Sequence, residues 1–156
     1  MNNRSRPEGV VIPTLIYDDV PAAVEWLCRV FGFSVRLVAG ATHAQLACGS
    51  GGGVMLGASR IEDAGDGSFR AFEPPGDRPV AQSTMVVVND VDAHFAHATE
   101  QGAPIELALA TQPYGERQYT VRDLAGHRWT FSQGVEDVDP ARWGARTGGM
   151  PPGVDE

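Results

Sequence analysis

Cysteine, positive charge and long apolar runs are all scarce in this sequence, and each shortage excludes a class of protein. Cys28 and Cys48 are the two cysteines among 156 residues. They are too few for a disulfide framework, so we expect two small buried side chains in a reducing compartment. No apolar run reaches the roughly 20 residues of a membrane span, and the polar first residues lack a secretion-signal core. We therefore expect a cytoplasmic protein.

The charge balance argues against polyanionic partners. The chain has 12 basic and 20 acidic residues, a formal net charge of −8, and its basic residues are scattered. Nucleic acids and anionic membranes are bound by clustered basic residues. We predict no nucleic-acid partner and no membrane partner. A hydrophobic fraction of 42% is enough for a buried core.

Residues 10–57 have the pattern of a β-α-β-β-β unit. Asp18 and Asp19 offer an N-cap, Pro21 suits a first helical turn, and Gly32 is placed to end the helix. Helical spacing of apolar residues lies between these signals. The predicted elements are a strand over 10–17, a helix over about 19–31 and short strands at 33–38, 43–48 and 54–56.

The same pattern begins again at residue 81. Residues 86–91 (VVVNDV) align with residues 15–20 (LIYDDV), and Gly102 repeats the helix stop. The predicted elements are a strand over 84–88, a helix starting after Asp90 and strands at 105–109, 117–122 and 128–132.

This repetition predicts an α+β fold of two tandem βαβββ modules. Each helix covers one face of its sheet, which leaves a concave face as the natural ligand site. The expected divisions are a disordered N-terminus at 1–9, modules at 10–57 and 81–133, an inter-module loop at 58–80 that is a lid or a linker, and a tail at 134–156, of which the last ten residues are expected to be disordered.

Several motifs carry a family resemblance. Residues 114–117 (YGER) followed by 121–131 (VRDLAGHRWTF), together with the helix starts at 16–20 and 86–92, are similar to the glyoxalase/bleomycin-resistance/dioxygenase group, also called the vicinal oxygen chelate superfamily. The resemblance implies that group's cupped mixed sheet and a homodimer. It specifies no single activity, because this fold carries lyases, dioxygenases and binding proteins.

The resemblance also implies a divalent metal held by His, Glu or Gln on four strands. The corresponding positions here are Ile12, Leu56, Ser83 and Thr130, and shifting each by one residue adds only Gln82. We therefore predict no metal cofactor at the family position. An unusual site that uses His43 and Gln45 stays open.

The other histidines have simpler explanations. His94 and His97, with Glu100, are expected on a solvated side of the second helix, and His127 in an exposed hairpin turn. Alternation places Tyr119, Val121, Trp129 and Phe131 beneath the helix. The opposite face supplies the predicted ligand-binding set: Ile12, Thr14, Ile16, His43, Gln45, Leu56, Ser83, Met85, Thr120, Arg128 and Thr130.

This lining is apolar with a few hydroxyls. Met85 suits an adaptable pocket, and Arg128 is either a surface residue or a partner for an anionic group. The first hypothesis is a metal-free protein, similar to the bleomycin-resistance-like members, that sequesters a hydrophobic or aromatic metabolite or antibiotic. The second is a metal-dependent lyase or dioxygenase with non-standard ligands, and the third is a scaffold for a protein partner. No catalytic residue is assigned, although acid–base chemistry at Glu116 stays open.

Overall fold

The computed structural model describes residues 7, 9, 11–49, 51–59, 72–146 and 148. The disorder expected at 1–9 and in the last ten residues falls almost wholly outside these residues, as does the middle of the 58–80 loop. No helix in the described part of the chain is long and apolar enough to cross a membrane.

The predicted order of elements is confirmed. The first module comprises β1 (Thr14–Tyr17), α1 (Val20–Phe31), β2 (Ser34–Ala39), β3 (His43–Cys48) and β4 (Gly52–Ala58). The second comprises β5 (Thr84–Val87), α2 (Val91–Glu100), β6 (Ile105–Thr111), β7 (Glu116–Arg122) and β8 (Arg128–Gly134), followed by the 3₁₀ helix η1 (Pro140–Trp143).

Each module forms its own four-stranded mixed sheet. The strand orders are β1-β4-β3-β2 and β5-β8-β7-β6, and the first strand of each module pairs in parallel with the last. This is the same topology twice, so the fold is the α+β tandem of βαβββ modules that the sequence pattern indicates.

Local signals start and stop the helices as expected. The Asp19 side chain accepts a hydrogen bond from the Ala22 amide at 2.9 Å, and Asp90 accepts one from Ala93 at 2.9 Å. Both carboxylates satisfy backbone donors that a helix leaves unpaired at its first turn. Gly32 ends α1 with a φ of 69°, a left-handed conformation that glycine adopts without strain.

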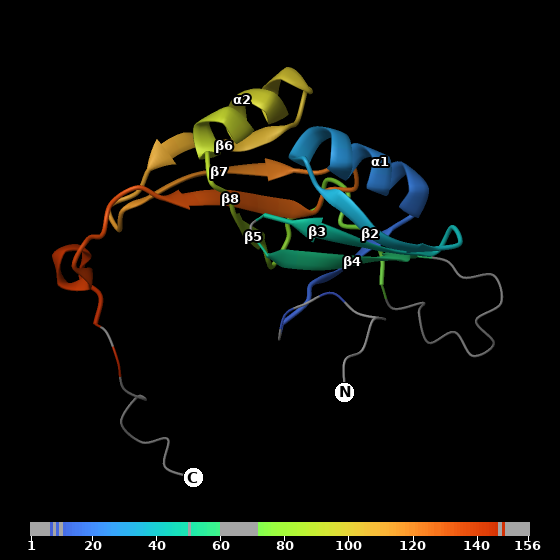
Figure 1. Cartoon of the computed structure of the whole chain (residues 1–156), viewed down its shortest axis with the longest axis horizontal. Helices are drawn as coiled ribbons and strands as arrows, with labels where there is room; N and C mark the ends of the chain where they lie inside the picture. Colours follow the sequence, from blue (N-terminus) through green and yellow to red (C-terminus); the bar gives the residue numbers. More distant parts are fainter. Residues whose placement is uncertain are drawn as a thin grey trace, which may run out of the picture.

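Both helices lie on the same side of the two sheets (Figure 1), and the core lies between. Tyr119, Val121, Trp129 and Phe131 are at most 1% exposed, in the helix-covered position predicted for them. Phe31, at the end of α1, reaches into the second module, where its ring centroid lies 4.8 Å from that of Phe131. The two modules therefore share one apolar core.

A buried carboxylate joins the two modules. Asp123 is 4% exposed and accepts hydrogen bonds from the Tyr17 hydroxyl at 2.6 Å and the Trp129 indole at 3.0 Å. Burial, followed by the adjacent Asp123 carboxylate, raises the pKa of Tyr17 well above its ordinary value, so the hydroxyl remains a donor. His127 is half-buried and lies 2.7 Å from the Ile16 carbonyl, which corrects the expectation of an exposed turn.

The histidines of α2 also join the modules. His94 Nε2 lies 3.1 Å from the Phe31 carbonyl and Nδ1 lies 2.7 Å from the Tyr119 hydroxyl, while His97 Nε2 lies 2.8 Å from the Arg29 carbonyl. Because a carbonyl only accepts, each Nε2 carries a proton. For His94 the expected solvated position is wrong, since the side chain fills the seam between the helices.

Candidate ligand-binding site

Strand β5 is flanked by cavities. One of about 400 Å³ lies between the inter-module segment 73–82 and the Arg128 end of β8. Another, of about 500 Å³, lies between the modules, where Val11, Pro13 and Val54 of the first face Met85 and Val87 of the second. Both volumes fall within the range of small-molecule pockets.

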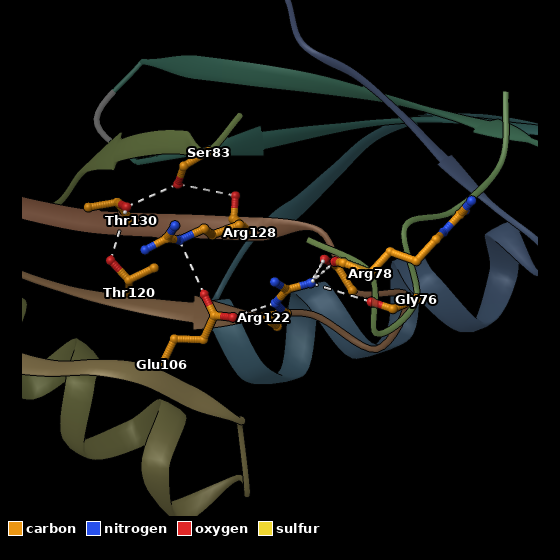
Figure 2. A network of polar contacts seen from close by, with 9 residues as sticks. Gly76, Arg78, Ser83, Glu106, Thr120, Arg122, Arg128 and Thr130 are labelled. Atoms are coloured by element: carbon orange, nitrogen blue, oxygen red, sulfur yellow. Dashed lines mark hydrogen bonds and ion pairs between the residues drawn. The ribbon is translucent and has the colours of Figure 1, made fainter. Parts of the chain in front are cut away.

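The helix-free face of the second sheet carries a chain of hydroxyl groups (Figure 2). Thr120 and Thr130 face each other across β7 and β8, with their oxygens 3.2 Å apart. The Ser83 hydroxyl lies 3.0 Å from that of Thr130 and 3.3 Å from the Arg128 carbonyl. Both threonines are less than 9% exposed.

The Arg128 carbonyl fixes the direction of this chain. Because the carbonyl accepts, Ser83 donates its only proton there, so Thr130 donates to Ser83 and Thr120 donates to Thr130. All three hydroxyl protons are used inside the chain. The outermost oxygen, that of Thr120, is left as a hydrogen-bond acceptor.

An ion-pair network lies beside the hydroxyl chain. Glu106, on β6, binds Arg122 Nε at 2.5 Å and lies 3.1 Å from Arg128 Nε. The second contact is an ion pair without the alignment of a hydrogen bond. Arg122 also donates to the carbonyls of Gly76, Arg78 and Gly126, which ties the inter-module segment to the β7–β8 turn.

Apolar side chains flank the polar centre. Met85, which pairs with Thr130 in register, and Leu107, which pairs with Thr120, are each 55% exposed. Val87 on β5 is 57% exposed. The helix-free face therefore combines hydroxyls and an arginine with unusually exposed apolar surface.

The other end of this face is acidic. Glu116 accepts a hydrogen bond from the Ser132 hydroxyl at 2.8 Å, and Gln118 donates to the Tyr114 hydroxyl at 2.9 Å. The buried Oε1 of Gln118 has no hydrogen-bond partner in the part of the chain that the structure describes. Tyr119 lies on the opposite face, against α2, so its hydroxyl is not a partner for Glu116 in acid–base chemistry.

His43 and Gln45 form a separate group on the first sheet. Their Nε2 atoms lie 3.3 Å apart, Arg36 donates to Oε1 of the Gln45 side chain, and Gln45 is 1% exposed. In register, Gln45 lies opposite Met55. Thr14 is exposed and Ile16 is 8% exposed, whereas Ile12 precedes β1 and is half-buried.

The placement of Leu56 on the cavity face is wrong. Leu56 is fully buried in the core, in register with Leu15 and Ala44. Successive strand residues point to opposite faces, so Met55 and Gly57 take the helix-free side. The glycines at 51–53 have no side chains, so the sequence does not show which residues of β4 point to which face of the sheet.

The predicted residues thus fall into two groups. Ser83, Met85, Thr120, Arg128 and Thr130 lie together on the second sheet, and His43 and Gln45 lie together on the first. Sequence reasoning missed Glu106 and Arg122. Their opposite charges on consecutive predicted strands were the available signal, but register shifts in the β6–β7 pairing hide their alignment.

Comparison with known proteins identifies the family. The sequence model of the Glyoxalase/Bleomycin resistance protein/Dioxygenase superfamily matches residues 9–131. An uncharacterised protein of Mycobacterium tuberculosis is 31% identical over 141 residues, covering 85% of this chain and 78% of its own length. The chain belongs to the glyoxalase/bleomycin resistance protein/dioxygenase superfamily.

Several solved structures share this architecture. TioX from a Micromonospora species is 35% identical with a TM-score of 0.62, covering 84% of this chain and all of its own. A superfamily protein from Nocardioides is 20% identical with a TM-score of 0.63, covering 94% of this chain and 91% of its own. A lactoylglutathione lyase from Agrobacterium tumefaciens is 22% identical with a TM-score of 0.58, covering 83% and 96%. The last two share the fold alone.

The side chains at the superfamily's metal position do not fit a divalent ion. The corresponding positions hold Ile12 and Ser83, which precede β1 and β5, Met55 or Leu56 on β4, and Thr130 on β8. These are aliphatic, thioether or neutral hydroxyl groups. Divalent metals at such sites take imidazole, thiolate, carboxylate or amide-oxygen ligands. No group of three or more His, Cys, Asp or Glu among the described residues is arranged to hold a metal. The superfamily position therefore lacks the donor set that a divalent metal requires.

Proposed function

We propose that the protein binds and sequesters a small hydrophobic or aromatic molecule, a metabolite or an antibiotic, without using a metal. The observation that carries this proposal is the helix-free face of the second module. There exposed Met85, Val87 and Leu107 border the Thr120–Thr130–Ser83 chain and Arg128. Apolar burial supplies affinity and a few fixed polar groups supply orientation, which is the usual division in small-molecule sites.

The test is a thermal-shift screen of aromatic metabolites and antibiotics, because a ligand that binds only the folded state raises the melting temperature. The matched variants are Met85→Ala, which removes exposed apolar surface beside a cavity, and Val35→Ala, which removes an exposed apolar side chain on β2. We expect Met85→Ala alone to weaken the stabilisation. Equal effects of both variants would place the ligand elsewhere.

A metal-dependent lyase or dioxygenase is the second candidate. The close approach of His43 and Gln45 supports it, because both side chains can ligate a metal. Metal analysis of protein purified without chelator separates the two candidates. Near-stoichiometric metal that is lost on His43→Ala would favour the enzyme and contradict metal-free binding.

We also propose a homodimer, as in other members of the superfamily. Val35, Val38, Met85, Val87 and Leu107 expose apolar surface on strands of both sheets, and covering such surface favours association. Light scattering tests the proposal, and a monomer at high protein concentration would contradict it.

A further inference from the structure

The arginine network carries more positive than negative charge. One carboxylate, Glu106, lies between two guanidinium groups, those of Arg122 and Arg128. Nearby, Glu73 and Arg78 form their own pair at 3.5 Å. Within the contact network of Glu106, Arg122 and Arg128, two guanidinium groups share one carboxylate, which leaves one positive charge.

The uncompensated charge belongs to Arg128. Arg122 is engaged by Glu106 and by three backbone carbonyls. Arg128 touches Glu106 only through Nε, and its Nη1 and Nη2 have no hydrogen bond to any described residue. Its side chain is 35% exposed. The two terminal nitrogens form the planar fork with which arginine binds a carboxylate.

The surroundings of the Arg128 guanidinium indicate what the rest of the ligand contacts. In Figure 2 the Arg128 side chain extends over the sheet toward Thr130 and Thr120. Thr130 pairs with Met85, which lines the apolar cavity of about 500 Å³ between the modules. Arg128 itself lines the neighbouring cavity of about 400 Å³. Met85 lies on the same face of the sheet, beside Thr130, which is two residues further along β8.

The hydroxyl chain makes Arg128 the donor for that anion. Ser83, Thr130 and Thr120 use their protons within the chain that ends on the Arg128 carbonyl, so none is free for a ligand oxygen. A single surplus charge is matched by a monoanion. A dianion such as a phosphate monoester would leave one negative charge beside Glu106.

We propose that the ligand is a monoanionic carboxylate on an apolar body, with its carboxylate on the Arg128 fork and its body against Met85 in the inter-module cavity. This rests on the proposed small-molecule function. It names the ligand class and the charge selection.

Three probes that share a naphthyl body test the proposal: naphthoate, its neutral amide naphthamide, and naphthyl phosphate, which is a dianion at pH 8. Binding is followed by NMR through the backbone amides of Met85, Thr120 and Thr130. We expect naphthoate to bind about tenfold or more tightly than naphthamide and more tightly than the phosphate. Added salt should weaken the binding of naphthoate and leave the binding of naphthamide unchanged.

Two substitutions test the assigned charges. Arg128→Gln should reduce naphthoate to the affinity of naphthamide while leaving naphthamide binding in place, which also shows that the variant is folded. Glu106→Gln adds a second surplus charge and should strengthen the phosphate several-fold. Arg142→Gln, an exposed arginine on η1, is the control and should change neither affinity.

The outcomes separate this inference from the proposed function. Equal binding of naphthoate and naphthamide to the unmodified protein would overturn the carboxylate site and leave small-molecule binding standing. Equal effects of Arg128→Gln and Arg142→Gln would overturn the assignment to Arg128. If no probe shifts the three amides at millimolar concentration, both the inference and the proposed site fail.

Discussion

At the scale of single residues, burial controls the chemistry of the Cys48 thiol. Cys48 is 7% exposed at the end of β3, and desolvation raises the pKa of its thiol to about 11. Because the thiolate is the reactive form, we predict that Cys48 resists iodoacetamide at pH 8 in the folded protein and reacts readily in urea. Mass spectrometry of the labelled peptide measures this. Rapid labelling without denaturant would contradict the burial.

His94 should make stability depend on pH. Burial lowers the pKa of His94 below its ordinary 6.5. Below about pH 6.5, His94 therefore becomes protonated in the unfolded chain while it stays neutral in the folded chain. Stability is therefore unaffected by His94 above this pH. It falls as pH drops from about 6.5 toward the folded pKa, by at most about 1.4 kcal/mol per pH unit.

His94→Gln removes this titration. Urea unfolding at pH 7.5, 6.5 and 5.5 should show a shallower decline for the variant than for the unmodified protein. Identical declines would mean that other groups carry the acid sensitivity.

At the scale of elements, two adjacent residues of strand β4 test which side chains point into the core. Leu56→Ala should cost about 2–5 kcal/mol, because it opens a cavity in a packed core. Met55→Ala should cost less than Leu56→Ala, since Met55 is partly exposed on the helix-free face. Urea unfolding measures the stability of both variants. Similar losses would contradict the assignment of Leu56 to the core face and Met55 to the helix-free face.

The elements differ in how well their sequence specifies them. The helix starts at Asp19 and Asp90 and the helix end at Gly32 depend on neighbouring residues, so they could be predicted. The face of Leu56 could not, because the preceding glycines give no alternation to count from. The contact of His127 with Ile16 joins residues 111 positions apart, and no local pattern encodes it. The Glu106 network depends on a register that β-bulges shift.

At the scale of the whole molecule, the hydrogen bond from Tyr17 to Asp123 should stabilise the packing of the two modules against each other. Tyr17→Phe removes one donor from a buried carboxylate, at an expected cost of about 1–3 kcal/mol. Tyr114→Phe is the matched control, because its ring is exposed and its hydroxyl bonds only Gln118 among the described residues. Urea unfolding measures both, and equal small losses would show that Asp123 is satisfied without Tyr17.

The shared Asp123 also bears on how such a repeated chain can evolve. Two copies of one unit begin as equals, and either copy can then be lost or exchanged. Here one half supplies the carboxylate and the other supplies the Tyr17 hydroxyl, and Phe31 of the first half packs on rings of the second. Because each module supplies a different side of these contacts, the two modules are not interchangeable in this fold. Each half needs a partner that differs from itself, so neither can serve as a substitute for the other.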